Sequence, residues 1–189
     1  MKFNIEVTGE KHCLFTDEIC KEMEESAKIR GTGIAKRSTE YIKKKIYVGE
    51  AVIALDEDNH FAGFSYIECW SHESFVANSG LIVNPKYRKS GLARQIKKNI
   101  FALSRKKFPD AKIFSITTSL AVMKLNSELG YKPVTFSELT NDEEFWNGCE
   151  ACVNYDILQR NERRMCLCTG MLYIPTQGQE QALPLHQNL

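Results

Sequence analysis

The stretch from Gly80 to Ala93 has the residue types of a phosphate-binding loop. An apolar run ends at Val83, and the pattern Arg88-x-x-Gly91-x-Ala93 leads directly into a helix-patterned segment. The first turn of a helix leaves its backbone N–H groups unpaired and carries a partial positive charge, so it attracts anions. Gly91 and Ala93 have little bulk, which allows a pyrophosphate to approach the main chain. The sequence therefore predicts a pyrophosphate site here.

A local excess of positive charge favours an anionic ligand at this site. No Asp or Glu occurs between Ser74 and Pro109, although nine of the 25 Lys and Arg residues of the chain lie there. We expect Lys97, Lys98 and Arg105 to belong to a solvated basic face of the helix. A nucleic-acid partner is not expected, because the whole chain has a net charge of only +1 and no aromatic stacking platform accompanies the basic residues.

The same stretch resembles motif A of the GNAT superfamily of N-acetyltransferases, in Val83, Pro85, Tyr87 and the Arg88-x-x-Gly91-x-Ala93 pattern. The resemblance implies that the loop binds the pyrophosphate of acetyl-CoA or another acyl-CoA. It also implies the full set of cofactor-binding residues, which are Leu81, Ile82, Val83, Arg88, Lys89, Ser90, Gly91, Leu92, Ala93, Ser119 and Asn126.

A second GNAT landmark, motif B, is partly present between Ser119 and Tyr131. Ser119 stands where the family usually has Asn, Leu125 fits the pattern, and Asn126 replaces a Tyr that protonates the departing CoA thiolate in many members. Asn126 cannot act as an acid, although its amide can hydrogen-bond the sulfur. The acid role falls to Tyr131, Tyr155 or water; the alternative for Tyr131 is a core aromatic residue.

Acyl transfer to an amine also needs a group that removes a proton from the ammonium form. The candidates are Glu68, which lies between Ile67 and Cys69 in a predicted strand, and His72 and Glu73, which we expect in an exposed hairpin turn. Glu68 is the preferred base, reached through a chain of water molecules; its alternative role is that of a structural carboxylate at a strand edge. A backbone N–H near residues 81–83 is expected to polarise the thioester carbonyl.

The resemblance places the acceptor site in the segment after the first helix. Here Arg30, Thr32, Lys36 and Arg37 surround a Gly-Thr-Gly backbone. Arginine can bind a carboxylate through two parallel hydrogen bonds, so we predict a small amine acceptor that carries a carboxylate, such as the amino acid glutamate. The alternative is a basic loop without a special role.

Four cysteines form two close pairs, Cys149-x-x-Cys152 and Cys166-x-Cys168, separated by 13 residues. Four soft ligands in two pairs are compatible with tetrahedral zinc. In a strand, however, Cys166 and Cys168 would point to one face, as small core residues do. Both interpretations stay open, and no metal is assigned to the predicted site.

Hydrophobic periodicity predicts the elements that position these residues. Strands are expected at residues 3–7, 51–55, 61–70, 75–83, 113–117, 131–136 and 165–174, and helices at 16–30, 38–46, 90–107, 120–129 and 142–146. The fold class is α/β (α+β), a GNAT-like mixed central sheet of about seven strands flanked by about four helices. In that fold the strands 75–83 and 113–117 would separate to admit the pantetheine arm.

The bulk composition indicates one globular domain, residues 1–174, followed by a Gln-rich tail, 175–189, that is expected to be disordered. With no signal peptide, no membrane span and an odd count of seven cysteines, a cytoplasmic location is expected. The predicted function is an N-acetyltransferase that uses acetyl-CoA in a ternary complex, and a homodimer is compatible with it. The alternatives are an acyl-CoA-binding regulatory protein without catalysis and a zinc-stabilised interaction module.

Overall fold

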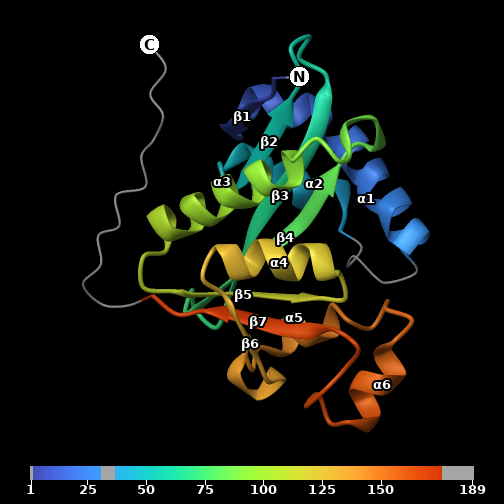
Figure 1. Ribbon diagram of the computed structural model, residues 1–189, viewed down its shortest axis with the longest axis vertical. Coiled ribbons are helices and arrows are strands. Elements are labelled where there is room, and N and C mark those ends of the chain that lie inside the picture. Colours follow the sequence, from blue (N-terminus) through green and yellow to red (C-terminus); the bar gives the residue numbers. More distant parts are fainter. Residues whose placement is uncertain (1, 31–36, 176–189) are drawn as a thin grey trace.

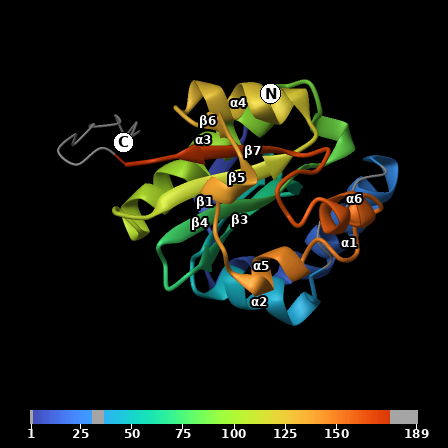
Figure 2. The same ribbon diagram turned by 90° about the horizontal axis from the view of Figure 1, so that it is seen from below.

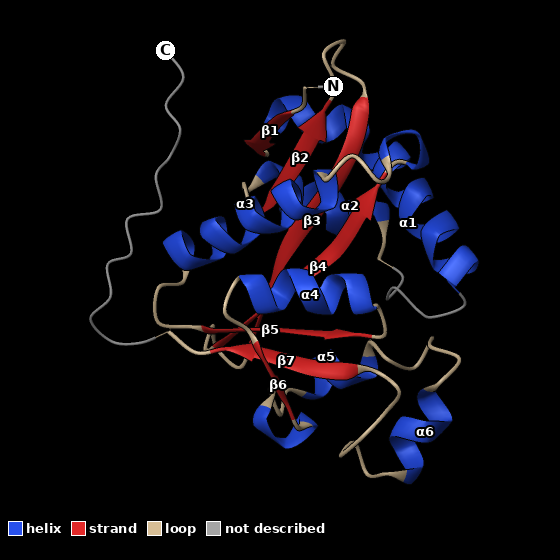
Figure 3. Ribbon diagram, viewed as in Figure 1, coloured by secondary structure: helices blue, strands red, loops and turns tan. Residues whose placement is uncertain are grey.

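The computed structural model describes residues 2–30 and 37–175, and its seven strands form one mixed sheet in the order β1-β2-β3-β4-β5-β7-β6. Figures 1 and 3 show the elements along the chain. The strands are β1 Asn4–Val7, β2 Ala51–Leu55, β3 Phe61–Trp70, β4 Phe75–Val83, β5 Lys112–Thr117, β6 Lys132–Val134 and β7 Thr169–Tyr173. The helices are α1 Thr16–Arg30, α2 Thr39–Tyr47, α3 Leu92–Lys107, α4 Leu120–Glu128, α5 Glu143–Asn147 and α6 Tyr155–Arg160, with 3-10 turns at Glu10–Phe15, Pro85–Tyr87 and Phe136–Glu138.

The sheet lies between two helical layers, with α3 and α4 on one face and α1, α2 and α5 on the other (Figure 2). The apolar stripe of α3 at Leu92, Ile96, Ile100 and Leu103 forms the core of the first face. On the other face, α1 and α2 bury one apolar cluster against β2–β4, and α5 and α6 bury a second one against β5 and β7. Strand β2 is buried at every position because helices cover both faces of the sheet. This burial explains why its sequence is a continuous apolar run.

The two central parallel strands, β4 and β5, pair over only three residues each. Phe75, Val76 and Ala77 pair with Lys112, Ile113 and Phe114, and the pairing then ends although both strands continue. Beyond that point β4 stays paired with β3 and β5 with β7, so the two strands diverge (Figure 1). The sheet therefore has a central opening, in the place where the sequence predicts it.

A bulge in β4 lies along this opening. Phe64 pairs with Ile82 but Tyr66 pairs with Ser79, so β4 contains one more residue than β3 between these pairs. The extra residue falls at Gly80 or its neighbour, and Gly80 has a φ of 62°, in the left-handed region. A bulge leaves a backbone group unpaired and bends its strand.

The sequence predicts most of the observed elements. Polar N-cap residues mark the start of two helices: Ser38 accepts a hydrogen bond from the backbone N–H of Tyr41, and Asp142 caps α5. The expected strand 131–136 is shortened to β6, an edge strand that contains Pro133 and passes into a 3-10 turn. Helix α6 and the 3-10 turn Glu10–Phe15 were not predicted. The tail 176–189 lies outside the described residues.

The last strand begins later than the sequence indicates. Strand β7 starts at Thr169, opposite Thr117, because β5 ends there and offers no further partner. Cys166 and Cys168 therefore precede the strand and lie in irregular chain. The prediction that these two cysteines lie within a strand was wrong, although both pack against the apolar cluster beneath β5.

Lys97 also departs from its predicted role. It was expected on the solvated face of α3, yet it is only 2% exposed. The reason is that α3 is covered on a second side, where Phe101 and Ser104 are buried with Lys97. No helix in the described part of the chain is long and apolar enough to cross a membrane.

Gly80 offers a test of the bulge. A Cβ atom at Gly80 would lie 2.4 Å from Cε1 of Tyr66, and its φ disfavours any other residue. We expect Gly80→Ala to lower the free energy of unfolding by roughly 2–4 kcal/mol, the sum of overpacking and left-handed strain. The matched control is Gly9→Ala, where no atom lies within 4 Å of the added carbon. Urea unfolding of both variants measures the difference, and equal stabilities would contradict the packing described here.

Candidate functional site

The segment Arg88–Ala93 forms an open loop at the N-terminus of α3. Gly91 is the N-cap of the helix with a φ of 82°, and Lys89 also has a left-handed φ of 66°. Within the described chain, the backbone N–H groups from Lys89 to Ala93 have no hydrogen-bond acceptor. A Cβ at Gly91 would meet nothing within 4 Å. The loop therefore presents free N–H donors and open space at a helix N-terminus, which suits a phosphate group.

Two side-chain tethers hold this loop in place. The Tyr87 hydroxyl donates a hydrogen bond to Oδ2 of Asp56 in the β2–β3 turn. On the other side, the Arg88 guanidinium donates to Glu22 (3.2 Å) and Ser26 (3.5 Å) of α1 and to the Val83 carbonyl (3.3 Å). Arg88, predicted as a cofactor ligand, thus also anchors the loop.

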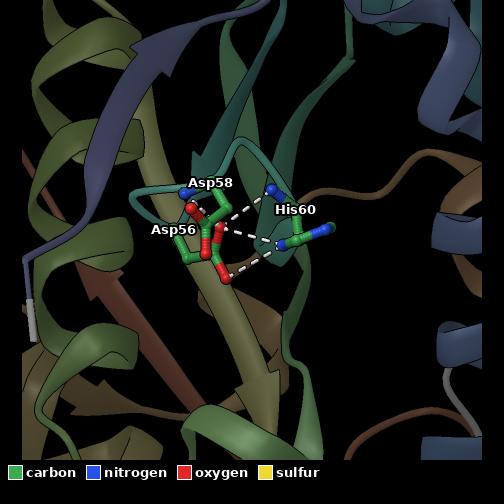
Figure 4. A group of neighbouring side chains, drawn as sticks. All are labelled: Asp56, Asp58 and His60. Atoms are coloured by element: carbon green, nitrogen blue, oxygen red, sulfur yellow. Dashed lines mark hydrogen bonds and ion pairs between the residues drawn. The ribbon is translucent and has the colours of Figure 1, made fainter.

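Asp56, Asp58 and His60 place their ligand atoms within 4.8 Å of one another, and no other three His, Cys, Asp or Glu residues of the described chain do so. Figure 4 shows how these side chains close the β2–β3 turn. Oδ1 of Asp56 accepts the backbone N–H groups of Asp58 and His60, both at 2.9 Å, and Oδ2 accepts from Tyr87. The Asp56 carboxylate is therefore saturated by turn and loop contacts, and the group is explained as a structural turn.

The predicted base, Glu68, is 4% exposed and lies on the face of the sheet covered by α1 and α2. Its Oε1 atom accepts hydrogen bonds from Arg37 Nε (3.0 Å), Arg37 Nη2 (2.8 Å) and the Tyr41 hydroxyl (2.9 Å). Oε2 has no partner among the described residues. Burial, followed by the charge of Glu68, raises the pKa of the Tyr41 phenol, so Tyr41 remains a hydrogen-bond donor. Sequence reasoning did not identify Tyr41, and nothing in its local pattern marks it.

Glu68 occupies a gap between two apolar clusters. Its cross-strand neighbour Ala77 belongs to the cluster beneath β5, and its partner Tyr41 packs against the cluster of α1 and α2. Ala77 is also the last residue of β4 that pairs with β5. The carboxylate therefore lies beside the point where the sheet opens.

The opposite face carries a buried polar chain. The Tyr131 hydroxyl donates to Asn78 Oδ1 (3.1 Å), and Asn78 Nδ2 donates to Ser104 Oγ (2.7 Å). Lys97 Nζ lies 5.2 Å from the centre of the Tyr131 ring, and burial lowers the pKa of Lys97 to about 7. Burial also raises the pKa of the Tyr131 phenol. Tyr131 is thus a core residue with a bonded hydroxyl, and its role as an acid stays a prediction.

Asn126 and Ser119 belong to α4, next to β5. Asn126 is fully buried; its Nδ2 contacts Met171 Sδ at 3.6 Å, and its Oδ1 has no hydrogen-bond partner. Ser119 caps α4 by accepting the backbone N–H of Val122 at 3.4 Å. His72 and Glu73 lie exposed in the β3–β4 turn, as expected.

The described residues of the predicted acceptor site reduce to Arg37. Thr32 and Lys36 lie outside the described residues, and for Arg30 only the backbone of α1 is described. Arg37 is positioned by Glu68 at the start of α2. The structure thus joins a predicted acceptor residue and the predicted base in one ion pair, while the predicted pyrophosphate loop lies at the other end of β4.

The four cysteines Cys149, Cys152, Cys166 and Cys168 all line one cavity beneath β5. Burial, and then the neighbouring thiols, raise the pKa of Cys149 to about 11 and that of Cys168 to about 12. The two pairs, distant in sequence, therefore converge in space.

The fold is that of the GNAT acetyltransferases. One similar structure is N-acetylglutamate synthase from Neisseria gonorrhoeae, complexed with coenzyme A and N-acetyl-glutamate (TM-score 0.64, 15% identity); the match covers 94% of this chain but 36% of that one. Another is a GNAT-family acetyltransferase from Staphylococcus aureus (TM-score 0.64, 10% identity), and the match covers 93% of this chain and 100% of that one. A third is phosphinothricin acetyltransferase from Sinorhizobium meliloti with acetyl-CoA (0.62, 14%, covering 96% and 97%). No family model and no curated protein matches the sequence.

The Asp56–Tyr87 tether predicts a pH-dependent loss of stability. The hydrogen bond from Tyr87 holds the pKa of Asp56 well below its usual range, so the carboxylate stabilises the fold above its ordinary pKa, and this contribution is lost as the pH falls through the lowered value. We expect Tyr87→Phe to be less stable than wild type near neutral pH, with a difference that shrinks below about pH 4.

Urea unfolding at a series of pH values measures this difference. Tyr47→Phe, at an exposed tyrosine at the end of α2, is the control and should behave as wild type. A Tyr87→Phe deficit that is constant from neutral to strongly acidic pH would show that the tether does not act through the Asp56 carboxylate.

Proposed function

We propose that this protein is an N-acyltransferase that moves the acetyl group of acetyl-CoA to the amine of a small acceptor by direct attack in a ternary complex. The observation that carries the proposal is the combination of an opened β4–β5 pair with a loop of free N–H donors at the N-terminus of α3. The first can accept an extended arm, and the second can bind the pyrophosphate at the end of that arm. The similar structures with coenzyme A or acetyl-CoA support the same donor.

In this reaction the amine nitrogen attacks the thioester carbon, the carbon–sulfur bond breaks, and coenzyme A leaves as a thiolate that takes up a proton. Positioning of the two substrates supplies much of the acceleration. A backbone N–H at the β4 bulge, near Leu81, is the proposed donor to the developing oxyanion. Glu68, through Oε2 and intervening water, is the proposed acceptor of the proton from the ammonium group.

The acceptor is proposed to carry a carboxylate. The side chain of Arg37 is 18% exposed, and it contacts Glu68 through Nε and Nη2, so Nη1 is the atom proposed to bind the carboxylate of the acceptor. N-acetylglutamate synthase, among the similar structures, is complexed with coenzyme A and N-acetyl-glutamate. An amino acid such as glutamate is therefore the first acceptor to test.

Binding of acetyl-CoA tests the donor site. We expect Gly91→Glu to weaken binding about 100-fold or more, a loss of about 2.7 kcal/mol, because its side chain enters the open space of the loop and adds negative charge. Lys98→Glu, a charge change of two units instead of one at an exposed position of the same helix, should leave affinity within about threefold because solvent screens it. Calorimetry measures both, after circular dichroism confirms that each variant is folded.

Release of free thiol with pooled amino acids and pooled amines then separates the candidate functions. Turnover with the amino-acid pool supports the proposed enzyme, and turnover with cationic amines alone would contradict a carboxylate acceptor. Acetyl-CoA binding without turnover in any pool would favour the regulatory acyl-CoA-binding protein. Absence of binding by the wild type would contradict both.

Glu68→Gln tests the proposed base. General base catalysis contributes about 100-fold to 10,000-fold, so kcat/KM should fall by at least the lower figure, and the rise of activity with pH should flatten. Tyr41→Phe removes one hydrogen bond to the same oxygen but keeps the carboxylate, so it should keep the rise with pH. Initial rates from mildly acidic to alkaline pH measure both variants. An unchanged profile in Glu68→Gln would remove this residue from the mechanism.

A further inference from the structure

The cysteine cavity is not used by the proposed acyl-transfer chemistry; it is lined mainly by residues between α5 and β7 and by Ile116 of β5. Cys149 and Cys152 follow α5, and Cys166 and Cys168 precede β7, so four thiols reach one small space from two irregular segments. The cavity has a volume of about 20 Å³, which is enough for one water molecule or ion.

The two cysteine pairs are linked by specific contacts. The backbone N–H of Cys152 donates to the carbonyl of Cys149 at 2.9 Å, which closes the Cys-x-x-Cys segment into a turn. Cys166 Sγ donates to the backbone carbonyl of Asn154 at 3.7 Å, so the second pair contacts the chain just after the first. This turn and this contact bring the cysteines of both segments to the same cavity.

We propose that Cys149, Cys152, Cys166 and Cys168 bind one structural Zn²⁺ ion. Four sulfur ligands in two close pairs are the donor set of closed tetrahedral zinc sites. The ligands bind as thiolates, so each loses its proton to solvent and the zinc–thiolate centre carries two negative charges.

Binding of one ion requires the two segments to move closer together. No three of the described cysteine sulfurs lie within 4.8 Å of one another. Zinc–sulfur bonds of about 2.3 Å place tetrahedral sulfurs about 3.8 Å apart, so the ion would draw the segments inward. Because the cysteines lie in turns and bends outside β7, this movement breaks no strand pairing.

The alternative, that these are small core residues, accounts less well for their placement. It rested on Cys166 and Cys168 sharing one face of a strand, and they precede the strand. Cys13, Cys20 and Cys69 each pack against an apolar cluster from within a helix, 3-10 turn or strand. Cys149, Cys166 and Cys168 also pack against an apolar cluster, but they do so from irregular chain and share one cavity with Cys152. Two pairs that meet at one cavity are better explained by a shared ligand.

Elemental analysis of the full-length protein, purified freshly without a metal-binding tag, tests the proposal. We expect one zinc per chain in wild type and near zero in Cys168→Ser. The matched control is Cys69→Ser, which also removes one half-buried thiol but lies in β3 against the core beneath α3, and it should keep one zinc.

Three further measurements keep the test decisive if Cys168→Ser folds poorly. Zinc should protect four of the seven thiols of wild type from a thiol reagent, and a chelator should expose them and lower the melting temperature. Cobalt added after zinc removal should give the visible bands of a tetrahedral thiolate site. Three results would overturn the proposal. They are substoichiometric metal with no cobalt spectrum, equal zinc in the two cysteine variants, and a disulfide between Cys149 and Cys152 detected by non-reducing mass spectrometry.

Discussion

The end of pairing between β4 and β5 is the constraint on which the rest of the molecule depends. After Ala77 and Phe114 the facing edges of the two strands no longer bond to each other. Each strand must then be held from its other side, by β3 for β4 and by β7 for β5. The unpaired edges need water or a ligand as partners, so an opening of this kind is stable only in a sheet that is well anchored on both sides.

The anchoring extends to the loop that follows β4. Tyr87 connects it to the β2–β3 turn through Asp56, and Arg88 connects it to α1 through Glu22. Both bonds involve a carboxylate and a donor from the loop, and both partners are largely buried, which strengthens such bonds. A loop with free N–H groups and two left-handed residues is thereby fixed before any anion arrives, so little ordering remains to oppose binding.

The sequence predicts the parts that depend on local pattern. Alternation and turn residues identify β3 and β4 to the residue, and the helix predicted at 90–107 begins two residues later, at Leu92. The sequence does not predict the burial of Lys97, because burial of a second side of α3 depends on the contact between Tyr131 and Phe101 in the core. It also gives no sign that Arg37 would pair with Glu68, because the two are brought together only when α2 packs on the sheet.

The cysteine cavity and the opening share one strand. Ile116 lies in the half of β5 that has separated from β4, pairs with Gly170 of β7, and lines the cavity. Any ordering of the segment 149–168 therefore fixes β7, and β7 is the strand that holds β5 where β4 no longer does. The edge strand β6 has only three residues, so it gives β7 little support from that side. A zinc ion bound next to β7 would therefore also stabilise the half of β5 that no longer pairs with β4.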